Sequence, residues 1–195
     1  MKRAQLEELL YQALETEQGG VEVYEHAVKC AQSDDLREEF SKYLDETRTH
    51  ETIMLRVLDT FGLDPGTETP GRSIIRTKAQ TLVRSMETAM EVDPAAAQLV
   101  AAECVVEAES KDHMNWELMG EVAGKLSGQE KKVLEEAYAE VGEQENQHLF
   151  HTMGWARELW LESLGLPAVL PPPEEQETTT AIGADRARQA RDEML

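Results

Sequence analysis

The fold is decided by residues 133–160, which read VLEEAYAEVGEQENQHLFHTMGWARELW. Side chains spaced three and four residues apart lie on one face of an α-helix. In this stretch that spacing selects one stripe, formed by Leu134, Tyr138, Val141, Glu145, His148, Thr152, Ala156 and Leu159. The stripe predicts an amphipathic helix over about 127–164, with Glu145 and His148 near its middle, where a packed helix usually carries apolar side chains.

The rest of the chain has three further long stretches with the same helical periodicity, at about 5–31, 35–61 and 94–126. A shorter helix is predicted over 74–92, after the turn-rich segment GLDPGTETPGRS at 62–73. Aromatic residues make up only 5% of the chain and alternating strand patterns are nearly absent, so strands are not expected. The order predicts an all-α fold, a ferritin-like four-helix bundle with a long helix-containing crossover between its second and third helices.

The character of the sequence changes after Gly165. The following segment, LPAVLPPPEEQETTT, is rich in proline and then polar, which is typical of an extended arm. We therefore interpret residues 1–165 as the bundle domain and residues 166–195 as a C-terminal arm. The end of the arm, AIGADRARQARDEML, could form a short helix.

Charge and cysteine spacing exclude several classes of protein. The formal net charge is −20, from 39 acidic and 19 basic residues, so the chain lacks the basic footprint that a nucleic-acid-binding protein needs. The cysteines are Cys30 and Cys104, and without a Cys-x-x-Cys motif a rubredoxin-type iron site is excluded. The sequence shows neither a signal-peptide core nor an apolar run of membrane length, so we expect a cytoplasmic protein that does not bind membranes.

Each bundle helix carries an acid or a histidine near its midpoint, on the face expected to be buried. These residues are Glu17, His50, Glu109 with Asp112 and His113, and Glu145 with His148. An unpaired carboxylate in a core is strongly disfavoured, so such a group must be paired, protonated or bound to a cation. Carboxylate and imidazole ligands suit iron, manganese or zinc. Their coincidence at matching depth on four helices predicts a metal site inside the bundle.

Three segments resemble the rubrerythrin branch of the ferritin-like superfamily, without its rubredoxin domain. They are LETEQGGVEVY at 14–24, AESKDHMNWELMGEVA at 108–123 and EVGEQENQHLF at 140–150. The motifs are short, and the likeness extends over roughly residues 5–62 and 95–160. The resemblance implies the ferritin-like fold, and it implies a homodimer, because such bundles often pair along their long helices.

The resemblance also implies a ligand set and a chemistry. It assigns metal-binding roles to Glu17, Glu109, Glu145 and His148, and it places Asp112 where the family has a second glutamate. Iron is the metal that it implies, in a di-iron site that oxidises ferrous iron or reduces peroxide or oxygen.

Residues 47–50 depart from the family's pattern, which has Glu-x-x-His in the second bundle helix. This chain has Thr47-Arg48-Thr49-His50, which retains the histidine but lacks the carboxylate that bridges metals in the family. Glu46 lies one position earlier and can share a helix face with His50, so it is a candidate replacement. Without a replacement, a single metal or a weakened pair of metals is expected.

The residues leave three functions open. The chain could be a di-iron or mixed-metal protein with the chemistry given above. It could instead hold one ion, such as zinc or manganese, that only stabilises the bundle, and Thr47 favours this interpretation. It could also be a metal-free helical scaffold that interacts with a partner through its C-terminal arm.

Overall fold

The computed structural model describes residues 1–173, and all of the regular secondary structure in that part of the chain is helical. The helices are α1 (Arg3–Cys30), α2 (Asp34–Thr60), α3 (Pro70–Val92), α4 (Ala97–Ala123) and α5 (Gly128–Ser163). The prediction of an all-α fold is therefore confirmed for these residues. The outer part of the predicted arm, 174–195, with its possible short helix, lies outside the described residues.

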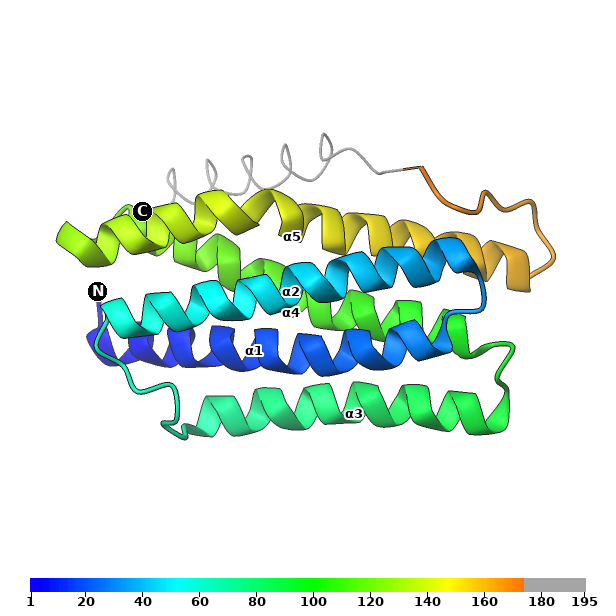
Figure 1. Cartoon of the computed structure of the whole chain (residues 1–195), viewed down its shortest axis with the longest axis horizontal. Helices are drawn as coiled ribbons and strands as arrows, with labels where there is room; N and C mark the ends of the chain where they lie inside the picture. Colours follow the sequence, from blue (N-terminus) through cyan, green and yellow to red (C-terminus); the bar gives the residue numbers. More distant parts are fainter. Residues whose placement is uncertain (174–195) are drawn as a thin grey trace, which may run out of the picture.

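The four long helices α1, α2, α4 and α5 lie along a common direction, and spatial neighbours run antiparallel (Figure 1). α1 packs against α2 and α4, and α5 packs against the same two helices from the opposite corner. The backbones of the diagonal pairs, α1 with α5 and α2 with α4, stay apart in the described structure, so the four helices surround one shared interior. α3 packs on the outside, against α1 and α4, and connects the second long helix to the third. The interior of the bundle is therefore lined by four separate helices.

Local signals explain where the helices begin and end. The Ser33 hydroxyl accepts a hydrogen bond from the Leu36 N–H at the start of α2, as an N-cap does. Gly62, with a positive φ of 67°, follows the end of that helix, where glycine adopts the left-handed conformation without strain. These two signals hold α2 to the length that the periodicity predicts.

The predicted start of the crossover helix, at residue 74, is wrong by one turn. α3 begins at Pro70, because the Thr69 hydroxyl caps the Arg72 N–H and proline suits the first turn of a helix. α4 begins at Ala97 rather than at residue 94, because Asp93 instead ends α3 and its carboxylate accepts hydrogen bonds within the connecting turn. Both changes affect the connections and leave the midpoints of the bundle helices in place.

The apolar core is divided into two clusters at opposite ends of the bundle. One cluster includes Leu10, Met54, Trp116 and Leu134. The other includes Val23, Phe40, Val105, Trp155 and Leu159. The residues between them, near the midpoints of the helices, are largely polar and buried: Glu17, Thr47, His50, Glu109, Asp112, Asn115, Glu145, His148 and Thr152. Apolar packing on both sides thus holds a polar layer at the centre of the bundle.

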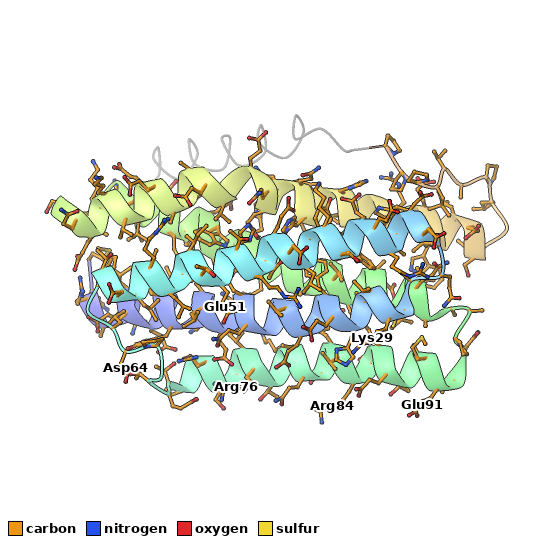
Figure 2. All side chains as sticks on the ribbon, viewed as in Figure 1. Lys29, Glu51, Asp64, Arg76, Arg84 and Glu91 are labelled. Carbon is orange, nitrogen blue, oxygen red and sulfur yellow. The ribbon has the colours of Figure 1, made fainter. Side chains whose placement is uncertain are left out.

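A buried ion pair attaches α3 to α1. Arg72 is only 4% exposed, and its Nε donates to Glu15 Oε2 over 2.8 Å. Arg76 Nε donates to the other carboxylate oxygen of Glu15 over 2.7 Å. The outer side of α3 is exposed, and Figure 2 shows Arg84 and Glu91 projecting there, away from α1. α3 therefore has one anchored face and one solvated face.

Across residues 1–173 we find no helix that is both long and apolar enough to cross a membrane.

Candidate metal centre

The polar layer contains six possible ligands that come from all four bundle helices. They are Glu17 on α1, His50 on α2, Glu109 and Asp112 on α4, and Glu145 and His148 on α5. None of the six is more than 4% exposed. The structure thus brings together five predicted ligands, Glu17, His50, Glu109, Glu145 and His148. Asp112, which the resemblance places at a ligand position, joins them.

The donor atoms form two groups that share Glu145. His50, Glu145 and His148 each place one donor atom within 4.8 Å of the others. Glu17, Asp112 and Glu145 do the same. Glu109 completes the cluster, because its Oε2 lies 3.7 Å from His148 Nδ1. The layer is therefore one continuous cluster of four carboxyl groups and two imidazoles.

Both histidines turn the same ring nitrogen toward the carboxyl groups. His148 Nε2 lies 2.8 Å from Glu46 Oε2, and His50 Nε2 lies 2.9 Å from Gln144 Oε1. A carboxylate oxygen accepts hydrogen bonds, so Nε2 of His148 carries the proton and its Nδ1 presents a lone pair to the cluster. His50 takes the same orientation, with its Nδ1 2.9 Å from Glu145 Oε1. Outer partners that fix the imidazole in this way are typical of histidines that bind metals.

Glu46, the candidate replacement for the missing carboxylate of the second bundle helix, lies at the outer edge of the cluster. It contacts the Nε2 side of His148 rather than the two groups of donor atoms. Thr47 is buried, and its hydroxyl donates to the Tyr43 carbonyl of its own helix. A Cβ on Gly20 would lie 3.2 Å from the Thr47 methyl carbon, so α1 and α2 approach closely at this level. Asp112, on α4, supplies the fourth carboxyl group of the cluster.

His113, also predicted as a candidate ligand, is not brought into the cluster. Its Nε2 lies 2.7 Å from Asn146 Oδ1, and its ring packs edge-on against Phe150. His113 follows Asp112 directly, and adjacent residues of a helix point about 100° apart. The side chain therefore lies between α4 and α5 at a different position from the buried ligands.

Several donor atoms of the cluster have no hydrogen-bond partner in the described structure. They are Glu17 Oε2, His50 Nδ1, Glu109 Oε2, Asp112 Oδ1, both oxygens of Glu145, and His148 Nδ1. Buried polar atoms are nearly always hydrogen-bonded, so a group of this size requires an explanation. Every ion-pair partner found for these carboxyl groups in residues 1–173 is His50 or His148, and none is a lysine or an arginine. A bound cation would satisfy the free atoms and the missing positive charge together.

Burial and mutual repulsion make the carboxyl groups hold their protons. Burial raises the pKa of Glu17, Asp112 and Glu145 well above the ordinary values, and neighbouring negative charges raise it further. Burial also raises the pKa of Glu109, although the nearby His148 opposes this shift. In contrast, burial lowers the pKa of His50, which keeps that imidazole neutral and able to bind a metal.

Two functional contacts could not be found from the sequence. Trp116 Nε1 donates a 2.7 Å hydrogen bond to Glu17 Oε1, and this bond orients the only ligand from α1. Gln144 orients His50 in the same way. Each contact joins two helices that are distant in the chain, so no spacing or periodicity signals it.

Comparison of the chain with protein-family models, with curated proteins and with solved structures gave no match.

Proposed function

We propose that this chain is a ferritin-like, rubrerythrin-type metal-binding protein whose bundle holds iron in a carboxylate and histidine centre. One observation carries the proposal: six buried ligand residues from four helices converge, and most of their donor atoms have no hydrogen-bond partner within residues 1–173. The helix-containing crossover between the second and third long helices agrees with that fold. The homodimer expected from the resemblance stays a prediction.

The charge and geometry of the cluster suit two divalent ions. Four carboxylates carry four negative charges, which would balance two such cations. Glu145 belongs to both groups of donor atoms, so it is placed to bridge two ions, and Asp112 would supply the charge that Thr47 lacks. Oxygen and imidazole ligands suit iron, and they also suit manganese and zinc.

The protein would contribute orientation and exclusion of water. Glu46 and Gln144 hold the imidazoles with Nδ1 facing inward, and Trp116 holds Glu17. The apolar clusters on either side keep bulk water from the layer. Bound iron would supply one-electron chemistry toward oxygen or peroxide, which would make the protein an oxidase of ferrous iron or a reductase of peroxide or oxygen.

A centre with one ion is the second candidate. His50 Nδ1 lies 2.9 Å from Glu145 Oε1, and His148 belongs to the same group of donor atoms. One zinc or manganese ion in this group would stabilise the bundle without turnover. A metal-free scaffold leaves the unpartnered donor atoms unexplained.

Metal content per chain tests the proposal. The full chain is loaded anaerobically with ferrous iron, desalted, and analysed by elemental mass spectrometry. We expect about two irons per chain, because the charge of four carboxylates balances two divalent ions. We expect none in the double variant His50→Ala/His148→Ala. One ion per chain would favour the second candidate. A folded helical protein that retains neither iron, manganese nor zinc would overturn the proposal.

Metal binding should release protons from the centre. Because Glu17, Asp112 and Glu145 have raised pKa values, they hold protons to higher pH than ordinary carboxyl groups do, and an incoming cation must displace these protons. The apparent affinity for metal should therefore increase with pH. Proton release is measured with an indicator dye in weakly buffered solution during anaerobic titration. Binding without release of protons at neutral pH would show that the carboxyl groups are already ionised.

A further inference from the structure

A separate cavity of about 500 Å³ lies between α1, α3 and α4. None of the six candidate metal ligands lines it. The cavity reaches the surface, because Lys78 and Glu107 on its walls are exposed. Its volume lies within the range of sites that bind small molecules, roughly 300–1,000 Å³.

Most of the cavity wall is apolar. α1 contributes Gly19, Gly20 and Val23, α3 contributes Leu82, and α4 contributes Ala108. An apolar wall of this kind favours a hydrocarbon or aromatic group over a hydrated ion.

Two lysines place positive charge at the same cavity. Lys78 of α3 and Lys111 of α4 both line it, and they are close enough for their charges to repel each other. Neither forms an ion pair within residues 1–173, although the whole chain has a net charge of −20. The Lys111 ammonium donates to a neutral amide oxygen, Asn115 Oδ1, and the charge of Asp112 attracts it more strongly than that of Lys78 repels it. Among the described residues that line the cavity, Glu107 is the one acidic residue.

The position of Lys111 is determined by a chain of hydrogen bonds along the cavity wall. Asn115 Nδ2 donates to the Thr16 hydroxyl over 3.0 Å, and that hydroxyl donates to the Gln12 carbonyl over 2.8 Å. Asn115 is fully buried, so it connects Lys111 to the core of the bundle. An ammonium group that hydrogen bonds already hold in place loses less conformational entropy when it binds an anion.

We propose that this cavity binds a small monocarboxylate with an apolar body, such as a medium-chain aliphatic acid. The carboxylate would lie between Lys78 and Lys111, and the hydrocarbon would cover Val23, Leu82 and Ala108. A single negative charge fits better than the double charge of a phosphate monoester, because Glu107 and the acidic body of the protein repel a dianion more strongly. None of the six candidate metal ligands lines this site, although Lys111 is adjacent to Asp112 in the sequence.

Calorimetric titration of the full chain with decanoate, below its micelle-forming concentration, tests the proposal. We expect saturable binding of one molecule per chain, with a dissociation constant below about 1 mM. The double variant Lys78→Ala/Lys111→Ala should bind about tenfold more weakly, because charge-assisted contacts are lost. Decylammonium and decyl phosphate should both bind more weakly than decanoate.

Two further variants separate loss of the site from loss of the fold. Ala108→Phe should block the cavity and remove binding, while its helical content stays native, because Ala108 is half-buried. Lys29→Ala removes an exposed lysine of α1 that does not line the cavity, and it should bind decanoate like the wild type (Figure 2). The proposal is overturned by unsaturable binding, by equal affinity for decylammonium, or by folded Lys78→Ala/Lys111→Ala and Ala108→Phe variants that bind like the wild type.

Discussion

Replacing Glu145 by Gln should abolish metal binding and at the same time stabilise the metal-free protein. Glu145 belongs to both groups of donor atoms, and neither of its oxygens has a hydrogen-bond partner in the part of the chain that the structure describes. Loss of a residue that merely orients a ligand lowers metal affinity by about 10–100-fold, so loss of the shared ligand should exceed about 100-fold. The amide retains the shape of the side chain but cannot supply its negative charge.

The gain in stability follows from the raised pKa of Glu145, which is caused by burial and then by the charges of Glu109 and Glu46. Between the ordinary pKa of about 4.3 and the raised value, the folded state holds a proton that the unfolded state has released. Stability therefore falls as the pH rises through that window. The E145Q variant avoids this loss, and we expect it to be about 1–3 kcal/mol more stable near neutral pH without metal.

Denaturant unfolding with and without ferrous iron measures both effects. Wild type should gain stability on adding the metal, and Glu145→Gln should not respond. Glu143→Gln is the matched control, because Glu143 is exposed and lies two positions earlier on the same helix. A metal-free Glu145→Gln variant that is less stable than wild type would contradict the account of the buried carboxyl group.

Replacing Arg72 by Ala should destabilise the fold by about 3 kcal/mol, because it removes one partner of a buried ion pair. Arg72 also donates to the carbonyls of Pro65 and Thr67, at 2.5 and 2.9 Å, so it attaches the preceding connection as well as α3. Arg76 still contacts Glu15 in the variant, but its side chain is 40% exposed and contributes less. The loss should be visible as a lower midpoint of unfolding.

The effect of Arg72→Ala should decrease in acid. Burial alone would raise the pKa of Glu15, but hydrogen bonds from Arg76 and Arg72 outweigh it and hold the pKa below its ordinary value. The ion pair therefore stabilises the fold above the ordinary pKa, about 4.3, and this contribution is lost as the pH falls through the lowered value. Unfolding is compared at neutral pH and below about pH 4.

Arg84→Ala is the control for Arg72→Ala, because Arg84 lies on the exposed side of the same helix (Figure 2). It should change stability by less than about 0.5 kcal/mol. An Arg72→Ala variant as stable as this control, or one equally destabilised at both pH values, would show that the ion pair does not anchor α3.

The five helices could be predicted from the sequence because their apolar positions recur with the helical period. Four helices surrounding one interior bury such stripes efficiently, so the all-α fold follows from periodicity. Starts and ends were less accurate, as at Pro70, where a Thr69 cap extends α3 into a segment whose glycines and prolines indicated a turn. A single side-chain hydrogen bond decides such a boundary, and periodicity carries no information about it.

The candidate site was predictable in part. Glu145 and His148 are one turn apart on an otherwise apolar stripe, so a buried polar pair could be expected from α5 alone. The position of Glu46 could not be predicted. Its spacing from His50 allowed it to face either the cluster or the outer side of a histidine on another helix. In the structure it orients His148.

The sequence by itself determined most of the buried positions along each helix, because burial of an amphipathic helix follows its own periodicity. Tyr138, in the stripe of α5, is an exception, because it is 38% exposed. Only the tertiary structure decided which buried groups meet. Asp112 joins Glu17 and Glu145, His113 lies apart, and the two histidines present Nδ1 to the carboxyl groups. These outcomes depend on the rotation and separation of four helices, which are set by packing between residues far apart in the chain.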